Sequence, residues 1–137
     1  MLKPSGTLIE IHPALEVPTV IVESAGAVSF EEDDPGFDYT EDLRMADEAV
    51  AAVVDRGLFR FEVDRRFEHR THAASVTELR DHWAVAGAYD AEEKEADVLR
   101  RRDEMYARAA AALDASSGVA EVIYVEPATM SRLTPSR

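Results

Sequence analysis

The chain of 137 residues contains no cysteine, which excludes a disulfide framework and a thiolate metal site. Basic residues are also scarce: 15 lysines and arginines against 28 aspartates and glutamates leave a net charge of −13. Such an acidic field repels phosphate backbones, so no nucleic-acid partner is expected. We interpret the charge as a source of solubility, with a cationic partner as the alternative. No apolar run is long enough for a membrane helix and no signal peptide is visible, so we expect a cytoplasmic protein with no membrane partner.

The first residues are typical of the middle of a domain. Lys3, Pro4 and Gly6 form a helix-stop pattern, although almost no chain precedes them. The β-branched run Thr7–His12 follows at once and predicts a buried strand, which Pro13 ends. We therefore expect this chain to correspond to the second half of something larger.

A β-hairpin and an acidic loop are expected next. The β-rich runs 17–23 and 27–30 flank a short loop that contains Gly26, a pattern typical of a hairpin. The following segment, Glu31 to Gly36, is rich in carboxylates and turn residues. Its spacing is not that of a calcium-binding loop, so we interpret it as a solvated acidic loop.

Three helices are indicated by their caps and their apolar periodicity. The first runs from Thr40, its expected N-cap, to Arg56. The second opens with the capping box Ser75–Glu78. The third is the longest and starts at Asp90, with Arg102 inside its apolar stripe, where we expect the side chain to reach outward to water.

Two further strands are expected. From residue 58 onward a period of two puts Phe59, Phe61, Val63 and Phe67 on one face, and His69 continues this inward series. Residues Val119 to Glu126 are apolar on both faces, which predicts an interior strand. The predicted domain therefore covers residues 1–126, and 127–137 form a poorly ordered tail.

This order of elements, together with Leu2-Lys3-Pro4-Ser5-Gly6 before a strand, resembles the carboxyl-terminal half of a class I S-adenosylmethionine-dependent methyltransferase. Val53 to Phe59 is similar to the stretch that precedes the sixth strand of that family. The resemblance implies an α/β, partial Rossmann-like fold: a mixed sheet with strand order five, seven, six, a hairpin insertion and about three helices. It also implies that 119–126 lies antiparallel between Thr7–His12 and the strand from Leu58.

The resemblance covers nearly the whole chain, but the chain lacks the half of the family's domain that binds the cofactor. The family holds its cofactor on a glycine-rich loop, whereas the glycines at 6, 26, 36, 57, 87 and 118 are too far apart to form one. We therefore expect no cofactor-binding residue in this chain. S-adenosylmethionine is expected to bind only if a partner half completes the site.

Glu10 and His12 are the candidate substrate-binding residues, and no catalytic residue is assigned. Ligands of open α/β sheets bind at the carboxyl ends of strands, where His12 lies. The simpler interpretation of His12 is a hydrogen bond to the backbone, and Glu10 could instead lean toward solvent. His69 and His72 have the spacing of some metal ligands. On a strand, however, residues three apart point to opposite faces, so no metal site is expected there.

Three hypotheses about function remain open. The chain could be a methyltransferase-like fragment or subunit that is inactive alone, a non-catalytic dimerisation or interaction module, or an unrelated α+β protein that binds a small ligand. The Thr7–His12 strand would lack the neighbour that the family places beside it. We therefore expect its edge to bind a second copy or a complementary chain, or to be covered by the hairpin.

Overall fold

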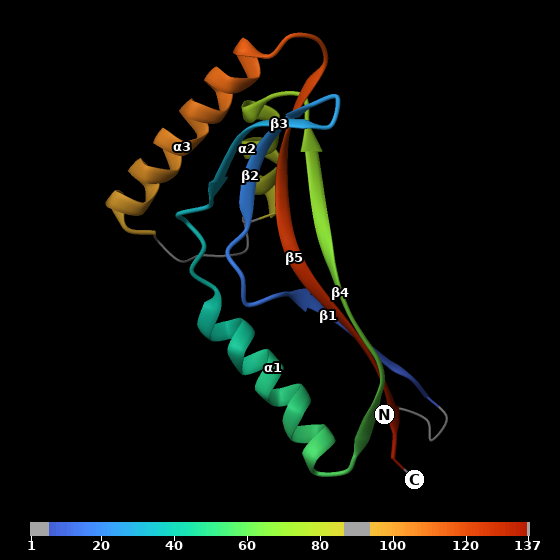
Figure 1. The fold of residues 1–137 in the computed structure, drawn as a ribbon. Helices are drawn as coiled ribbons and strands as arrows, with labels where there is room; N and C mark the ends of the chain where they lie inside the picture. The colour runs from blue at the N-terminus through green and yellow to red at the C-terminus, as the bar shows by residue number, and fades with distance from the viewer. Residues whose placement is uncertain (1–5, 87–93, 137) are drawn as a thin grey trace. The chain divides into compact units, whose positions relative to one another are not determined.

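The computed structural model describes residues 6–86 and 94–136. Within them the chain forms an α/β fold of five strands and three helices (Figure 1). In chain order these are β1 (Leu8–Pro13), β2 (Thr19–Ser24), β3 (Ala27–Asp33), α1 (Thr40–Asp55), β4 (Phe59–Ala73), α2 (Val76–Ala86), α3 (Ala96–Ala115) and β5 (Ala120–Pro135). The α/β class, the hairpin and the three helices agree with the sequence-based prediction. The start expected at Asp90 for the third helix falls outside the described residues.

The long strand β5 organises the sheet, whose order is β1-β5-β2-β3 with β4 also paired to β5. Strand β2 pairs with the first part of β5, and β1 pairs with its later part, both antiparallel. Because β1 and β2 take successive stretches of β5, the pairing with β4 uses the other edge. The interior position predicted for residues 119–126 is therefore confirmed, while the pairings among β1, β2, β3 and β5 are all antiparallel rather than mixed.

Two details of the expected pairing were wrong. Thr7–His12 was expected beside residues 119–126, but Leu8 to Pro13 pair with Leu133 to Ala128, and β2 takes residues 120–125. Residues 127–135, expected as a tail, belong to β5. Polar and small residues such as Ser131 gave this segment no strand-like periodicity, and backbone pairing to β1 orders it instead.

The chain divides into two compact units, which we describe separately. The first comprises residues 1–16, 38–69 and 126–137, and the second comprises 17–37 and 70–125. Strands β4 and β5 contribute residues to both, so the single domain boundary expected after residue 126 lies inside β5.

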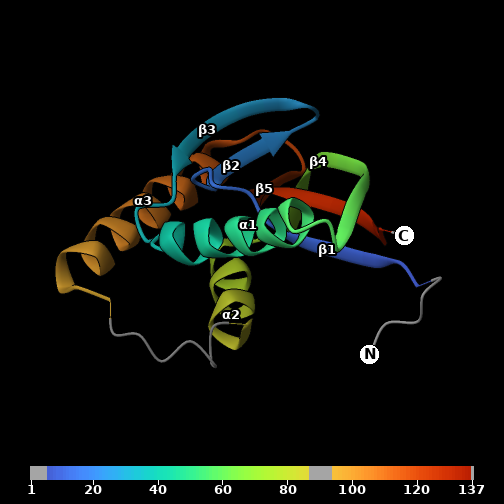
Figure 2. The ribbon, with the colours of Figure 1, turned by 90° about the horizontal axis from the view of Figure 1, so that it is seen from below.

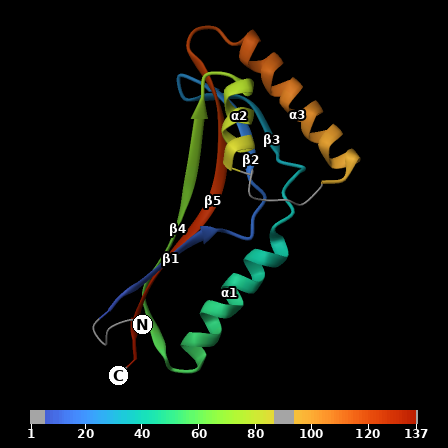
Figure 3. The same ribbon diagram turned by 180° about the vertical axis from the view of Figure 1, so that it is seen from behind.

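The second unit contains a well-packed core on one face of the β2–β5 pair. Its buried members include Val20, Val22, Leu79, Met105 and Val122. Helix α3 packs on β2 and β3, as Figure 3 shows, and α2 packs on α3. The hairpin turn places Ala25 and Gly26 at positive φ, which suits the right-handed twist of the two strands.

The capping box predicted for α2 is present. The Glu78 backbone N–H donates to Ser75 Oγ at 3.1 Å, and the Glu78 carboxylate accepts from the Ala74 N–H at 2.8 Å. The first bond satisfies a backbone donor of the first helical turn, and the second satisfies the N–H of Ala74, just before Ser75.

Asp34 and Arg102 form a buried ion pair, which differs from what the sequence predicts for either residue. The loop containing Asp34 was expected to be solvated, but this residue is only 2% exposed. Its carboxylate accepts hydrogen bonds from the Gly36 N–H (2.8 Å), the Tyr124 hydroxyl (2.9 Å) and the Arg102 guanidinium (3.0 Å). Arg102 therefore turns inward to a buried partner instead of reaching for water, because a buried carboxylate requires a counter-charge and donors.

The first unit is built from β1, α1, the early part of β4 and the end of β5. Figure 2 shows α1 crossing beside β1. Ser136 N donates to Leu58 O at 3.0 Å and Ser131 Oγ donates to Asp64 Oδ1 at 3.2 Å, so β4 runs antiparallel to β5 here. The N-cap of α1 is Tyr39 and not Thr40, which is already helical.

This unit leaves many apolar side chains exposed. Phe61 and Phe67, expected to point inward, are 46% and 40% exposed, and His69, expected to continue their series, is also exposed. A period of two shows that a strand has an apolar face, but not whether anything packs on that face. The face of β4 that carries these side chains is therefore only partly covered, since Phe59 and Val63 are half-buried while Phe61 and Phe67 are exposed.

Candidate functional site

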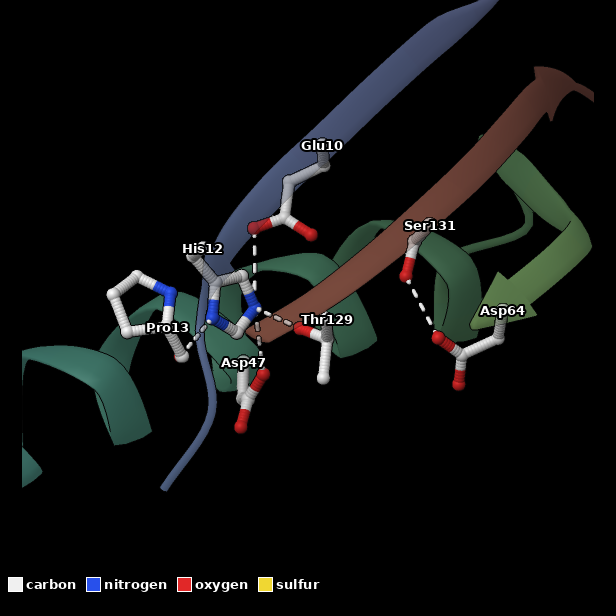
Figure 4. A network of polar contacts seen from close by, with 7 residues as sticks. All are labelled: Glu10, His12, Pro13, Asp47, Asp64, Thr129 and Ser131. Carbon is white, nitrogen blue, oxygen red and sulfur yellow. Dashed lines mark hydrogen bonds and ion pairs between the residues drawn. The ribbon is translucent and has the colours of Figure 1, made fainter. Parts of the chain in front are cut away.

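His12 lies at the carboxyl end of β1 and is the centre of a polar cluster in the first unit (Figure 4). Its Nε2 lies 3.1 Å from Glu10 Oε1, 3.1 Å from Asp47 Oδ1 and 3.3 Å from Thr129 Oγ1. Its Nδ1 lies 2.7 Å from the Pro13 carbonyl oxygen. The backbone hydrogen bond expected for a strand-end histidine is present, and the side chains around Nε2 add a second set of contacts.

Secondary structure explains how these side chains meet. Glu10 and His12 are two apart on β1, so they share one face of the strand. Thr129 is the direct partner of His12 in the β1–β5 register, which puts both side chains on that face. Asp47 comes from α1, which lies over the same face.

The hydrogen-bonding roles constrain where the protons lie. The Pro13 carbonyl only accepts, so Nδ1 of His12 carries a hydrogen. Nε2 then faces carboxylate oxygens of Glu10 and Asp47, which are acceptors only when the groups are ionised, and the Thr129 hydroxyl, which can donate or accept. A proton shared between Nε2 and one of the carboxyl groups would satisfy this arrangement. Burial raises the pKa of Glu10 above its ordinary value, although the nearby His12 opposes this rise.

The cluster can give or accept one proton and can hold a polar group of a ligand. The His12 side chain is 13% exposed and that of Asp47 is 49% exposed, so the cluster is open on the α1 side. Within residues 6–86 and 94–136, no group of three or more histidine, aspartate or glutamate side chains has a geometry that could hold a metal ion.

Asp47 and Thr129 are the members of this cluster that sequence reasoning missed. Asp47 is four residues after Leu43 and three before Val50, so it lies within the apolar stripe of α1. A carboxylate in such a stripe was the available signal. Thr129 gave none, because its segment was interpreted as a tail.

A shallow hollow of about 160 Å³ borders His12. It is lined by Ile11, His12, Pro13, Phe67, His69, Glu126 and Ala128. His69 Nδ1 lies 3.9 Å from Glu126 Oε2, so the two form a loose ion pair. His72 has a separate partner, Glu121, at 3.0 Å in the second unit.

The partly buried carboxyl group of Glu126 should give the protein a measurable pH dependence of stability. Burial raises its pKa above the ordinary value of 4.5, with His69 opposing. The unfolded chain then loses this proton at lower pH than the folded chain does, so stability falls as pH rises from about 4.5 through the raised value. Glu126→Gln should weaken this fall in stability. The free energy of unfolding of the variant, relative to that of wild type, should therefore be higher at pH 7 than at pH 4.

Urea unfolding followed across this pH range checks the prediction. Glu121→Gln is the matched control, because Glu121 also pairs with a histidine on β4 but is half exposed. An identical pH dependence in wild type and Glu126→Gln would contradict the prediction.

Within the described part of the chain, no helix is long and apolar enough to cross a membrane. The chain matches no protein-family model, no curated protein and no solved structure.

Proposed function

We propose that this chain is the substrate-side half of a methyltransferase-like enzyme, inactive alone and completed by a chain that binds along the free edge of β1. One observation carries the proposal. The final strand β5 is antiparallel to β1 and also pairs with β4. This pairing agrees with the resemblance for residues 128–133 of β5, since the family inserts its last strand antiparallel between these two neighbours, whereas residues 120–125 pair with β2.

The cofactor would come with the partner. The chain has no pair of glycines close enough to form a phosphate- or cofactor-binding loop. Its own contribution would be the His12 cluster, which lies at the carboxyl end of β1 and borders a hollow of about 160 Å³. There Glu10, His12 and Asp47 would orient a hydrogen-bond donor of the methyl acceptor.

A non-catalytic association module is the second candidate, and a specific observation favours it. Ile9 and Ile11 lie on β1, and each is at least 60% exposed. Apolar side chains on a strand with one unpaired edge are typical of a surface that pairs with another strand. Both candidates use the same edge and differ in whether the completed complex binds S-adenosylmethionine.

The isolated chain should show no measurable binding of S-adenosylmethionine in isothermal titration, because it lacks the backbone amides of a glycine-rich loop. The chain co-expressed and co-purified with the product of the adjoining open reading frame should bind it. Ile11→Pro, which removes an edge N–H, should prevent co-purification, and Val85→Ala on an exposed helix face should not.

Two results would overturn the proposal. Micromolar binding by the chain alone, near −8 kcal/mol, would place a cofactor site within this chain. An adjoining chain that binds Ile11→Pro as well as it binds wild type would show that the β1 edge is not the contact.

A further inference from the structure

The free edge of β1 has a defined set of unused backbone groups. Ala14 N donates to Pro127 O at 2.7 Å, which continues the β1–β5 ladder by one residue. Hydrogen-bonded pairs alternate along an antiparallel ladder, so Glu10 and His12 also direct their backbone groups toward β5. Ile9 and Ile11 therefore direct theirs away from β5, and no strand within the described residues pairs with that edge.

The side chains on this strand are also unusually placed. Ile9 and Ile11 are 61% and 60% exposed, whereas Glu10 and His12 are partly buried against α1 and β5. Ile9 and Ile11 thus face outward, while Glu10 and His12 face inward. Isolated exposed isoleucines are common, but two on one strand with an unpaired edge favour association through that edge.

We propose that this edge pairs antiparallel with β1 of a second copy of the chain, with Ile9 of each copy opposite Ile11 of the other. The inference rests on the proposed function in that both assign a partner strand to this edge; the second copy takes the edge when the complementary chain is absent. A two-fold axis then passes near Glu10. Every N–H and C=O of Ile9 and Ile11 gains a partner, and the isoleucines of both copies meet on one face.

Proline explains why this register is preferred to one centred on Ile11. That register would place Pro13 opposite Ile9, and Pro13 has no N–H to offer the Ile9 carbonyl. Its own carbonyl already accepts from His12 Nδ1. The unfavourable feature of the proposed register is that the Glu10 carboxylates face each other, but each retains His12 of its own chain at 3.1 Å.

The net charge of −13 opposes dimerisation without preventing it. At physiological ionic strength charges are screened beyond about 8 Å. Repulsion between the bodies of the two copies is therefore weak compared with backbone pairing at the strand. Dimerisation should strengthen as salt is added.

Sedimentation equilibrium of the wild-type chain should show a dimer, and Ile11→Pro should raise the dissociation constant about tenfold or more, which is about 1.4 kcal/mol. This substitution removes a donor only from the free edge, so the β1–β5 ladder remains intact. Ile11→Val is the control, because it keeps the N–H and a β-branched side chain. A monomeric wild type, or equal association of Ile11→Pro and wild type, would overturn the proposal.

The absence of native cysteine allows the register to be tested directly. A single Glu10→Cys should form a disulfide-linked dimer on mild oxidation, since opposite residues of a non-hydrogen-bonded pair lie within disulfide range. It also removes the facing carboxylates. If the Ile9→Cys or Ile11→Cys variant forms a disulfide-linked dimer and the Glu10→Cys variant does not, the proposed register is overturned.

Failure of the dimer proposal and failure of the proposed function give different experimental results. If wild type is monomeric and Ile11→Pro still abolishes binding of the adjoining chain, the second copy is excluded and the proposed function stands. If wild type dimerises through Glu10→Cys but no complex binds S-adenosylmethionine, the proposed function fails and the dimer stands.

Discussion

Replacing Asp34 with alanine is expected to destabilise the second unit by about 3–5 kcal/mol, the usual cost of removing one partner of a buried ion pair. The substitution leaves the Arg102 guanidinium without its counter-charge and the Tyr124 hydroxyl and Gly36 N–H without their acceptor. Arg102 Nε is already buried without a hydrogen-bond partner in the described structure, so losing Asp34 adds a further unsatisfied donor to the same guanidinium.

Chemical denaturation followed by the fluorescence of Trp83, the single tryptophan, measures this effect. Trp83 reports on the right region because its ring lies 4.8 Å from that of Tyr124. Glu32→Ala is the matched control. Glu32 also pairs with an arginine of α3, Arg108, but both side chains are substantially exposed, so the change should be far smaller. Equal destabilisation by the two variants would show that burial of Asp34 does not govern its contribution.

Leu79→Ala should destabilise the same unit by about 2–5 kcal/mol, because it opens a cavity in a packed core. Leu79 is fully buried and belongs to the cluster that α2, α3 and the β2–β5 pair enclose. The spread in the expected value reflects how far Met105 and its neighbours can move into the space.

Val85→Ala is the control on the same helix, since Val85 is 75% exposed. Denaturation monitored through Trp83 should show a clear shift of the midpoint for Leu79→Ala and almost none for Val85→Ala. A shift of similar size for both would mean that helix propensity, rather than core packing, dominates at these positions.

The candidate site illustrates the limit of sequence-based prediction. Glu10 and His12 were identified because a strand end is a general place for ligands, and both do lie in one cluster. Asp47 and Thr129 complete the cluster from α1 and β5, and no local pattern states which helix residue will lie above which strand residue. That depends on the β1–β5 register and on where α1 packs, which are long-range properties.

Local chemistry along the chain was enough to predict most of the helices and strands. Ser75 and Glu78 predicted the start of α2, the loop with Gly26 predicted the hairpin, and apolar periodicity predicted α1, because each signal acts between residues a few positions apart. Tertiary structure alone decided which charges are buried and which apolar residues are exposed. Asp34 meets Arg102 across 68 residues, and the Ile11 side chain remains exposed because nothing within the described residues packs on its face of β1. Burial depends on what packs against a side chain, and distant parts of the chain determine that.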